Sequence, residues 1–184
     1  MSSWLPRRFG RIGFVALLLA GGLVVWQRTL PLRKPAVPNI DPVIGRMLPL
    51  AGTVPLPGHA EPSMPVAKSG QAHLVNLFAS WCVACRVEAP VLATLAADGV
   101  RIDGIAVRDE PAAVARFLQH DGNPFAGVRL DRRGQVQAAL GAAGLPETYL
   151  VDAGGMVRYR HRGALRADDL AAITNELQQA RATR

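Results

Sequence analysis

The stretch FASWCVACRVEAP, residues 78–90, contains both cysteines of this 184-residue chain, Cys82 and Cys85. A continuous apolar run, HLVNLFA at residues 73–79, leads into it and predicts a strand buried on both faces. From Cys82 to about Ala97, apolar residues recur at the spacing of a helix: Val83, Val87, Val91, Leu92 and Leu95. The two cysteines are therefore predicted to lie where a buried strand turns into a helix.

The elements beyond this turn follow from the same kind of periodicity. Residues 100–107 and 147–152 have strand character, and a turn at residues 153–155 precedes an antiparallel strand at 156–161. Pro111 opens a helix, and a last helix buries Leu170, Ile173 and Leu177. Residues 125–130 and 135–140 are consistent with a short strand and a short helix. The order predicts an α/β fold with a central mixed β-sheet flanked by helices.

The net charge of +7 does not point to nucleic acid. Six basic residues and no acidic residue lie in the first 34 positions, so the remaining 15 basic and 14 acidic residues nearly balance. The excess charge surrounds an apolar segment, and no later basic cluster is interleaved with aromatic residues. The composition therefore disfavours nucleic-acid binding.

That apolar segment, residues 12–26, has 15 residues without a charge. No small-x-small cleavage site follows it, and Arg11 and Arg28 can extend its span by snorkelling. We therefore expect residues 1–30 to form an uncleaved signal anchor, a single N-terminal transmembrane helix, with a cleaved signal peptide as the alternative. A short N-terminus before the first span normally stays inside, which places the rest of the chain outside.

Nine of the 14 prolines lie between Pro31 and Pro65. Because proline disrupts helices and central strands, residues 31–72 are expected to be a proline-rich linker and an N-terminal wrap. Apolar residues within it are candidates to dock on the domain formed by residues 73–184: Met47, Leu48, Leu50, Val54 and Leu56.

A Cys-x-x-Cys pair at the start of a helix is typical of redox-active thiols. The unpaired N–H groups and the dipole of the helix stabilise a thiolate at Cys82, which becomes the attacking thiol, with Cys85 as the resolving thiol. A structural metal site and a structural disulfide are the other interpretations. The four histidines have no ligand spacing, and a disulfide across two residues closes too small a loop to stabilise much. Redox chemistry without a metal or prosthetic group is favoured.

The segment from Trp81 to Cys85 resembles the active site of the thioredoxin superfamily, in which Pro90 matches a helix-kinking proline and Leu145-Pro146 matches the cis-proline loop. GAAGLPETYLVDAGGMVRYRHRGAL, residues 141–165, resembles the membrane-anchored thiol:disulfide interchange proteins of cytochrome c maturation, the DsbE/CcmG family. The resemblance covers about residues 42–180. The pair Arg108-Asp109 resembles an inserted basic-acidic pair of that family.

The resemblance implies roles for individual residues. Trp81, Leu145 and Pro146 are expected to bind the substrate. Where thioredoxins carry a buried aspartate beneath the cysteines, this chain has Asn76, and Glu147 is expected to be the replacement acid that relays a proton to Cys85. Many relatives have proline where this chain has Ala84, so the reduction potential is not predicted.

The implied activity is that of a thiol:disulfide oxidoreductase that reduces apocytochrome c, or a maturation partner that carries it. Its electrons are expected from a membrane thiol reductant of the DsbD/CcdA type. The expected location is the bacterial inner membrane, with the thioredoxin-like domain in the periplasm. One alternative is a general extracytoplasmic thioredoxin-like reductase. Another is a copper-chaperone-like binding protein, although that class resembles C-x-x-x-C with a partner histidine.

Overall fold

The computed structural model describes residues 41–59 and 71–182. The chain divides into two units, Met1–Asn39 and Ile40–Arg184, and all the described residues belong to the second. The anchor expected at residues 12–26 therefore lies outside the described residues. None of the helices in the described ranges combines the length and the apolar character needed to cross a bilayer.

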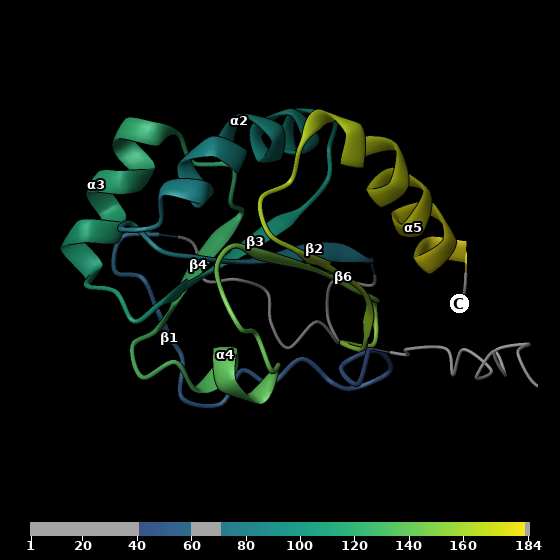
Figure 1. The fold of residues 1–184 in the computed structure, drawn as a ribbon, viewed down its shortest axis with the longest axis horizontal. Coiled ribbons are helices and arrows are strands. Elements are labelled where there is room, and N and C mark those ends of the chain that lie inside the picture. The colour runs from purple at the N-terminus through teal and green to yellow at the C-terminus, as the bar shows by residue number, and fades with distance from the viewer. Residues whose placement is uncertain (1–40, 60–70, 183–184) are drawn as a thin grey trace, which may run out of the picture. The chain divides into compact units, whose positions relative to one another are not determined.

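A mixed sheet forms the centre of the domain, with strand order β1-β4-β3-β2-β5-β6 (Figure 1). Strand β2 runs parallel to β3, and β3 parallel to β4, whereas β5 is antiparallel to both β2 and β6 and β1 is antiparallel to β4. The strands are β1 (Val54–Pro55), β2 (His73–Phe78), β3 (Ile102–Val107), β4 (Gly127–Asp131), β5 (Glu147–Val151) and β6 (Val157–Arg162). The predicted mixed α/β sheet is confirmed, with boundaries shifted by one or two residues.

Helices cover both faces of this sheet. Helices α2 (Val83–Ala97), α3 (Pro111–Asp121) and α5 (Leu170–Ala182) lie on one face, and the short α4 (Gln135–Ala139) lies on the other (Figure 1). A 3-10 turn, η2 (Ala167–Asp169), leads into α5. Each face therefore has its own core, and the central strand β2 is buried at all six positions.

The two cores differ in what they contain. The core under α2, α3 and α5 includes Cys82 and Cys85, with Phe78, Leu92 and Ile173 among its members. The core on the α4 face includes Leu77, Tyr149 and Val136. Because successive side chains of a strand point to opposite faces, neighbours in β2 and β5 belong to different cores. A residue of these strands can contact the cysteines only if its side chain lies on the face under α2, α3 and α5.

The buried face of α2 is not the one that its valines suggested. Val83 and Val87 are 69% and 66% exposed, and the buried residues of the helix are Cys85, Glu88, Ala89, Leu92 and Leu95. The sequence pattern had grouped the valines with Leu92 and Leu95, which was wrong for Val83 and Val87. Pro90 lies inside α2, where it removes one backbone hydrogen bond.

Residues 41–59 pack along the domain, within the segment expected to be linker and wrap. Backbone bonds join Gly45 and Arg46 to Val157, and β1 adds a short edge strand beside β4. Leu48 and Leu56 are buried, as expected, whereas Met47 and Val54 are 56% and 49% exposed. Part of the proline-rich segment is thus built into the sheet and its α4-side core.

Candidate active site

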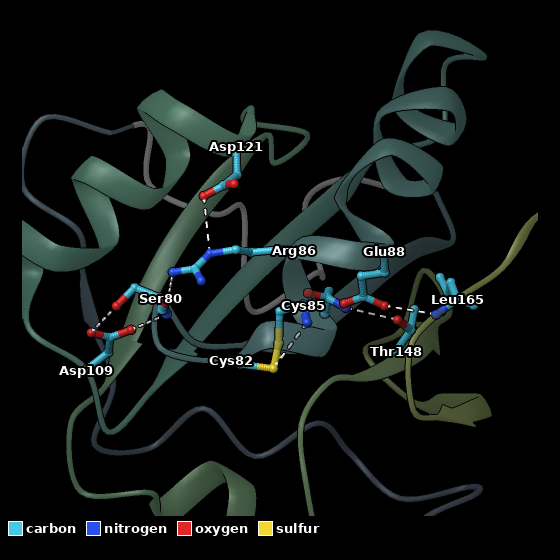
Figure 2. Close-up of a disulfide and its surroundings, with 10 residues drawn as sticks. Ser80, Cys82, Cys85, Arg86, Glu88, Asp109, Asp121, Thr148 and Leu165 are labelled. Carbon is cyan, nitrogen blue, oxygen red and sulfur yellow. Dashed lines mark hydrogen bonds and ion pairs between the residues drawn. A yellow bond between two sulfur atoms is a disulfide. The ribbon is translucent and has the colours of Figure 1, made fainter.

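The two cysteines form a disulfide at the start of α2 (Figure 2). Strand β2 ends at Phe78, a turn closes with Cys82 N–H donating to the Ala79 carbonyl, and the helix begins at Val83. Cys82 occupies the N-cap position with extended backbone angles, and its Sγ accepts from Cys85 N–H at 3.2 Å. A thiolate at Cys82 would meet the unpaired N–H groups of the first helical turn, which favour negative charge.

The disulfide lies beneath an exposed apolar rim. Cys82 is 6% and Cys85 2% exposed, whereas Trp81 beside them is 59% exposed. The indole Nε1 of Trp81 donates to the Arg108 carbonyl at 3.4 Å, at the end of β3. The exposed Trp81 side chain therefore lies next to Cys82 in the chain, where a docking protein can contact it.

The Leu145–Pro146 peptide bond is cis, as its match to a cis-proline loop predicted. The antiparallel register sets Leu77 opposite Glu147, so Pro146 lies opposite Phe78, at the end of β2 from which the cysteine turn departs. The Pro146 carbonyl accepts from Gly163 N–H at 3.0 Å, and Leu145 packs against the core that contains both cysteines. The fold therefore places the Leu145–Pro146 loop at the end of β2 from which the cysteine turn departs.

A buried carboxyl group lies beneath the disulfide, and it belongs to Glu88, which was not among the site residues predicted from sequence. Glu88 follows Cys85 by one helical turn and is fully buried. Its Oε1 accepts from Asn76 Nδ2 at 3.0 Å. Its Oε2 accepts from Leu165 N–H at 3.1 Å (Figure 2). Burial raises the pKa of Glu88 to about 7, although these two hydrogen bonds act in the opposite direction.

Cys85, Glu88 and Asn76 line one small cavity of about 10 Å³. This volume is roughly the space that one water molecule needs. Three aromatic rings also line the cavity, those of Phe78, Phe117 and Phe125. Asn76 Nδ2 donates to Thr148 Oγ1 as well as to Glu88, while its Oδ1 has no hydrogen-bond partner within the described residues. The space beside Cys85 is thus apolar except for the Asn76–Glu88 pair.

Glu147 does not lie beneath the cysteines, so its predicted place as the replacement acid is wrong. Its Oε2 accepts from Tyr149 Oη at 2.5 Å and lies 2.7 Å from Arg160 Nη2. Tyr149 belongs to the core on the α4 face, opposite the core that holds the disulfide. Thr148 is the β5 residue that points toward α2, because side chains alternate along a strand.

A second carboxylate holds the turn before Cys82. Asp109 is 7% exposed and accepts from Ser80 N–H at 2.5 Å and from Ser80 Oγ at 2.9 Å (Figure 2). It also accepts from Glu110 N–H at 2.8 Å. Arg108 before it has a φ of 49°, in the left-handed region that non-glycine residues seldom adopt. The basic-acidic pair therefore fixes the cysteine turn, with Arg108 binding Trp81 through its carbonyl and Asp109 binding Ser80.

Comparison with known proteins agrees with this geometry. The family model described as Redoxin matches residues 62–177. The "Thiol:disulfide interchange protein DsbE homolog" of Paracoccus denitrificans is 36% identical over 127 residues, which cover 69% of this chain and 70% of that protein. The chain belongs to the DsbE family of thiol:disulfide interchange proteins. As a member of this family it is a thiol:disulfide oxidoreductase.

Other relatives match over a shorter length. DsbE of Escherichia coli K12 is 39% identical over 100 residues, and the match spans 54% of each chain, about half the length of that relative. The crystal structure of a putative DsbE from Chlorobium tepidum has a TM-score of 0.57 at 23% identity, covering 75% of this chain and 97% of that one. Together with the sheet and helices of Figure 1, it establishes the thioredoxin-like fold.

Proposed function

We propose that this chain reduces disulfides in apocytochrome c, or in a partner protein that carries it, during cytochrome c maturation. The observation that carries the redox part is the placement of Cys82 Sγ as the N-cap of α2, in a disulfide with Cys85. The cytochrome part is supported by the motif at residues 141–165 and by the DsbE relatives. Trp81, Leu145 and Pro146 are the proposed substrate-binding residues.

The reaction begins with the reduced form of the chain. The Cys82 thiolate attacks one sulfur of the substrate disulfide, the substrate S–S bond breaks, and the second substrate sulfur leaves as a thiolate. The Cys85 thiolate then attacks Cys82 Sγ, which releases the first substrate sulfur and forms the Cys82–Cys85 disulfide. Two electrons pass to the substrate, which leaves as a dithiol.

Cys85 must lose a proton before it attacks, and Glu88 is the proposed acceptor. The Glu88 carboxylate shares the small cavity with Cys85, and its pKa of about 7 lets it exist in both protonation states at neutral pH. The proton passes directly or through one water molecule, for which the cavity has room. Glu88 is therefore the proposed proton relay, the role that the sequence resemblance predicts for Glu147.

The oxidised chain must be reduced again after each turnover. We propose a membrane thiol reductant of the DsbD/CcdA type as the source of the two electrons, because the compartment outside the inner membrane is oxidising. The apolar residues 12–26 and their basic flanks support a single-pass anchor with the domain in the periplasm. If the anchor is retained, the full-length chain stays in the membrane fraction after an alkaline wash. An N-terminus beginning near residue 30 would contradict this.

Trapping with a defined substrate tests the proposal. Reduced Cys85→Ser protein is mixed with purified apocytochrome c whose haem-binding cysteines are oxidised, and mixed disulfides are counted by mass spectrometry. We expect Cys85→Ser to accumulate a mixed disulfide through Cys82, and Cys82→Ser to form none. The wild-type chain should reduce apocytochrome c faster than an unrelated disulfide protein of similar size. Equal rates for the two substrates would favour a general extracytoplasmic reductase instead.

A further inference from the structure

A groove of about 470 Å³ lies between the cysteine turn and α3, apart from the cavity beneath the disulfide. One side of it is formed by Ser80 and Arg86, at either end of the cysteine turn. The other side is one face of α3, because the residues that line it recur at helical spacing: Ala113, Arg116, Phe117, His120 and Asp121. The volume falls within the range of pockets that bind ligands.

The groove lies beside the turn that carries the two cysteines, which are not themselves among its lining residues. Ser80 precedes Cys82 by two residues, so their Cα atoms are at most about 7 Å apart. Arg86 follows Cys85 and reaches back across the turn, where its Nη2 donates to the Ser80 carbonyl at 2.9 Å (Figure 2). Phe117 lines both the groove and the small cavity that contains Cys85. A chain bound in this groove would therefore pass next to the turn that carries the reacting cysteines.

Positive charge dominates the groove. The Arg86 side chain is 49% exposed, and its Nε lies 3.6 Å from Asp121 Oδ2, an ion pair that solvent screens. Arg116 is exposed and has no ion-pair partner among residues 41–59 and 71–182. The groove thus carries two guanidinium groups and an imidazole against one carboxylate, that of Asp121.

We propose that this groove binds an acidic stretch of the substrate chain next to the cysteine that is being reduced. The inference rests on the proposed function, since it names a property of that substrate. Opposite charges across an interface raise the association rate and select among partners, which suits an exchange reaction that begins with a transient encounter. Trp81 and Val83, both exposed, provide an apolar contact for any substrate, and Arg116 and Arg86 provide the discrimination by charge.

Peptide disulfides that differ only in charge test the proposal. Three peptides share one disulfide and carry glutamate, glutamine or lysine at the three positions on the N-terminal side of a cysteine, and a second set carries them on the C-terminal side. The reduced full-length chain is mixed with each peptide at low ionic strength, and the rate of reduction is followed by tryptophan fluorescence. In at least one set, we expect the rate of reduction of the glutamate peptide to exceed that of the lysine peptide by a factor of about five or more.

Two groove variants and one matched control separate the groove from the net charge of the protein. Arg116→Glu should remove or reverse the preference for glutamate, whereas Asp121→Asn should increase it, because Arg86 is then released from its ion pair. Arg181→Glu makes the same charge change as Arg116→Glu at an exposed position of α5, which does not line the groove, and should keep the preference of the wild-type chain. The preference should fade as salt rises to about 0.5 M.

The outcomes distinguish the inference from the function on which it rests. If all peptides of both sets are reduced at equal rates at low salt, the acidic-substrate inference is wrong while disulfide reduction stands. If Arg181→Glu loses the preference for the glutamate peptide as fully as Arg116→Glu does, that preference comes from the net charge of the protein. The proposal that the groove causes it is then wrong. If no peptide disulfide and no apocytochrome c is reduced, the proposed function itself fails.

Discussion

Cys85 and Glu88 lie one helical turn apart on the buried face of α2 and line the same cavity of about 10 Å³. Glu88 is fully buried and held by Asn76 and by the Leu165 N–H. Burial raises its pKa to about 7, so the group changes its protonation state near neutral pH. A carboxyl group that gains or loses a proton at small cost, next to a thiol that must lose one, is suited to proton exchange.

The first prediction concerns the rate at which Cys85 resolves the mixed disulfide. Glu88→Gln keeps the size of the side chain but cannot accept a proton, so resolution should slow by about tenfold or more. The initial attack by Cys82 should change less, because Cys82 is stabilised by the helix N-terminus. Stopped-flow measurement of both steps between pH 6 and pH 8 separates them.

Glu147→Gln is the control for this measurement. It makes the same chemical change on the opposite face of the sheet, where Glu147 contacts Tyr149 and Arg160. Its resolution rate and pH profile should match those of the wild-type chain. A Glu88→Gln profile that superimposes on the wild type would falsify the relay role of Glu88.

The second prediction concerns stability against pH, measured on the oxidised chain. The folded pKa of Glu88, about 7, exceeds the ordinary value of 4.5, so the folded state binds more protons between these pH values. The stability from this group is present below pH 4.5 and is lost as pH rises through 7. The loss amounts to about 3 kcal/mol, because a tenfold change in proton affinity corresponds to about 1.4 kcal/mol. Glu88→Gln does not titrate and escapes this loss.

Urea unfolding at pH 4.5, 6 and 8 measures this difference. Relative to the wild-type chain, Glu88→Gln should gain about 3 kcal/mol in its free energy of unfolding between the lowest and the highest pH. The comparison across pH cancels the constant cost of leaving Leu165 N–H without its carboxylate acceptor. A difference between the two proteins that stays constant with pH would show that the pKa of Glu88 is not raised.

The fold and the redox pair could be predicted from sequence because their signals are local. A continuous apolar run followed by Cys-x-x-Cys at the start of a helix specifies the turn at Cys82, and the proline after Leu145 marks the loop beside it. The buried acid does not follow from the apolar pattern, because a face that includes Val83 and Val87 turns Glu88 toward solvent. The spacing of Glu88 from Cys85, Leu92 and Leu95 held the missing signal, since all four share one helical face.

The misplacement of Glu147 has a different physical cause. Its position in the sequence, next to Pro146, is close to the cysteines, but a strand sends neighbouring side chains to opposite faces. Thr148 therefore points toward Asn76, and Glu147 points toward the α4-side core. Only the register of β5 against β2 decides between these faces, and that register is a tertiary property.

The third prediction concerns Asp109, which accepts three hydrogen bonds at the cysteine turn. Asp109→Asn keeps the shape but replaces one acceptor oxygen by an NH2 group, which then faces either Ser80 N–H or Glu110 N–H. The free energy of unfolding should fall by about 1–3 kcal/mol, because buried donors lose their partner. Urea unfolding measures this, and amide hydrogen exchange should quicken at whichever of Ser80 and Glu110 loses its acceptor.

Asp98→Asn is the matched control for Asp109→Asn. Asp98 is the C-cap of α2, and its side chain is exposed. Substitution there should change the free energy of unfolding by less than about 0.5 kcal/mol. If Asp109→Asn costs no more than Asp98→Asn, Asp109 does not hold the turn as its contacts indicate.

The last prediction concerns the pair of Glu147 and Arg160, whose side chains are 4% and 3% exposed. Arg160 Nε also donates to Glu147 Oε2 at 2.8 Å, and Tyr149 donates to the same oxygen. Burial, together with this bond, raises the pKa of Tyr149, so its hydroxyl stays protonated. Glu147→Gln leaves Arg160 buried with only the more distant Asp41 carboxylate, at 3.4 Å. We expect it to cost about 3 kcal/mol in the free energy of unfolding.

Arg160→Met should cost a similar amount, because it leaves the Glu147 carboxylate buried without its cation. The double variant should cost clearly less than the sum of the two single variants, since neither charge is then stranded. A double-mutant cycle by urea unfolding gives the coupling between the two side chains. Because the pair lies on the α4 face of the sheet, all three variants should reduce a peptide disulfide at the wild-type rate while they stay folded. If the losses in the free energy of unfolding are additive, the two charges are independent. If the folded variants reduce the peptide disulfide more slowly than the wild type, Glu147 takes part in the reaction.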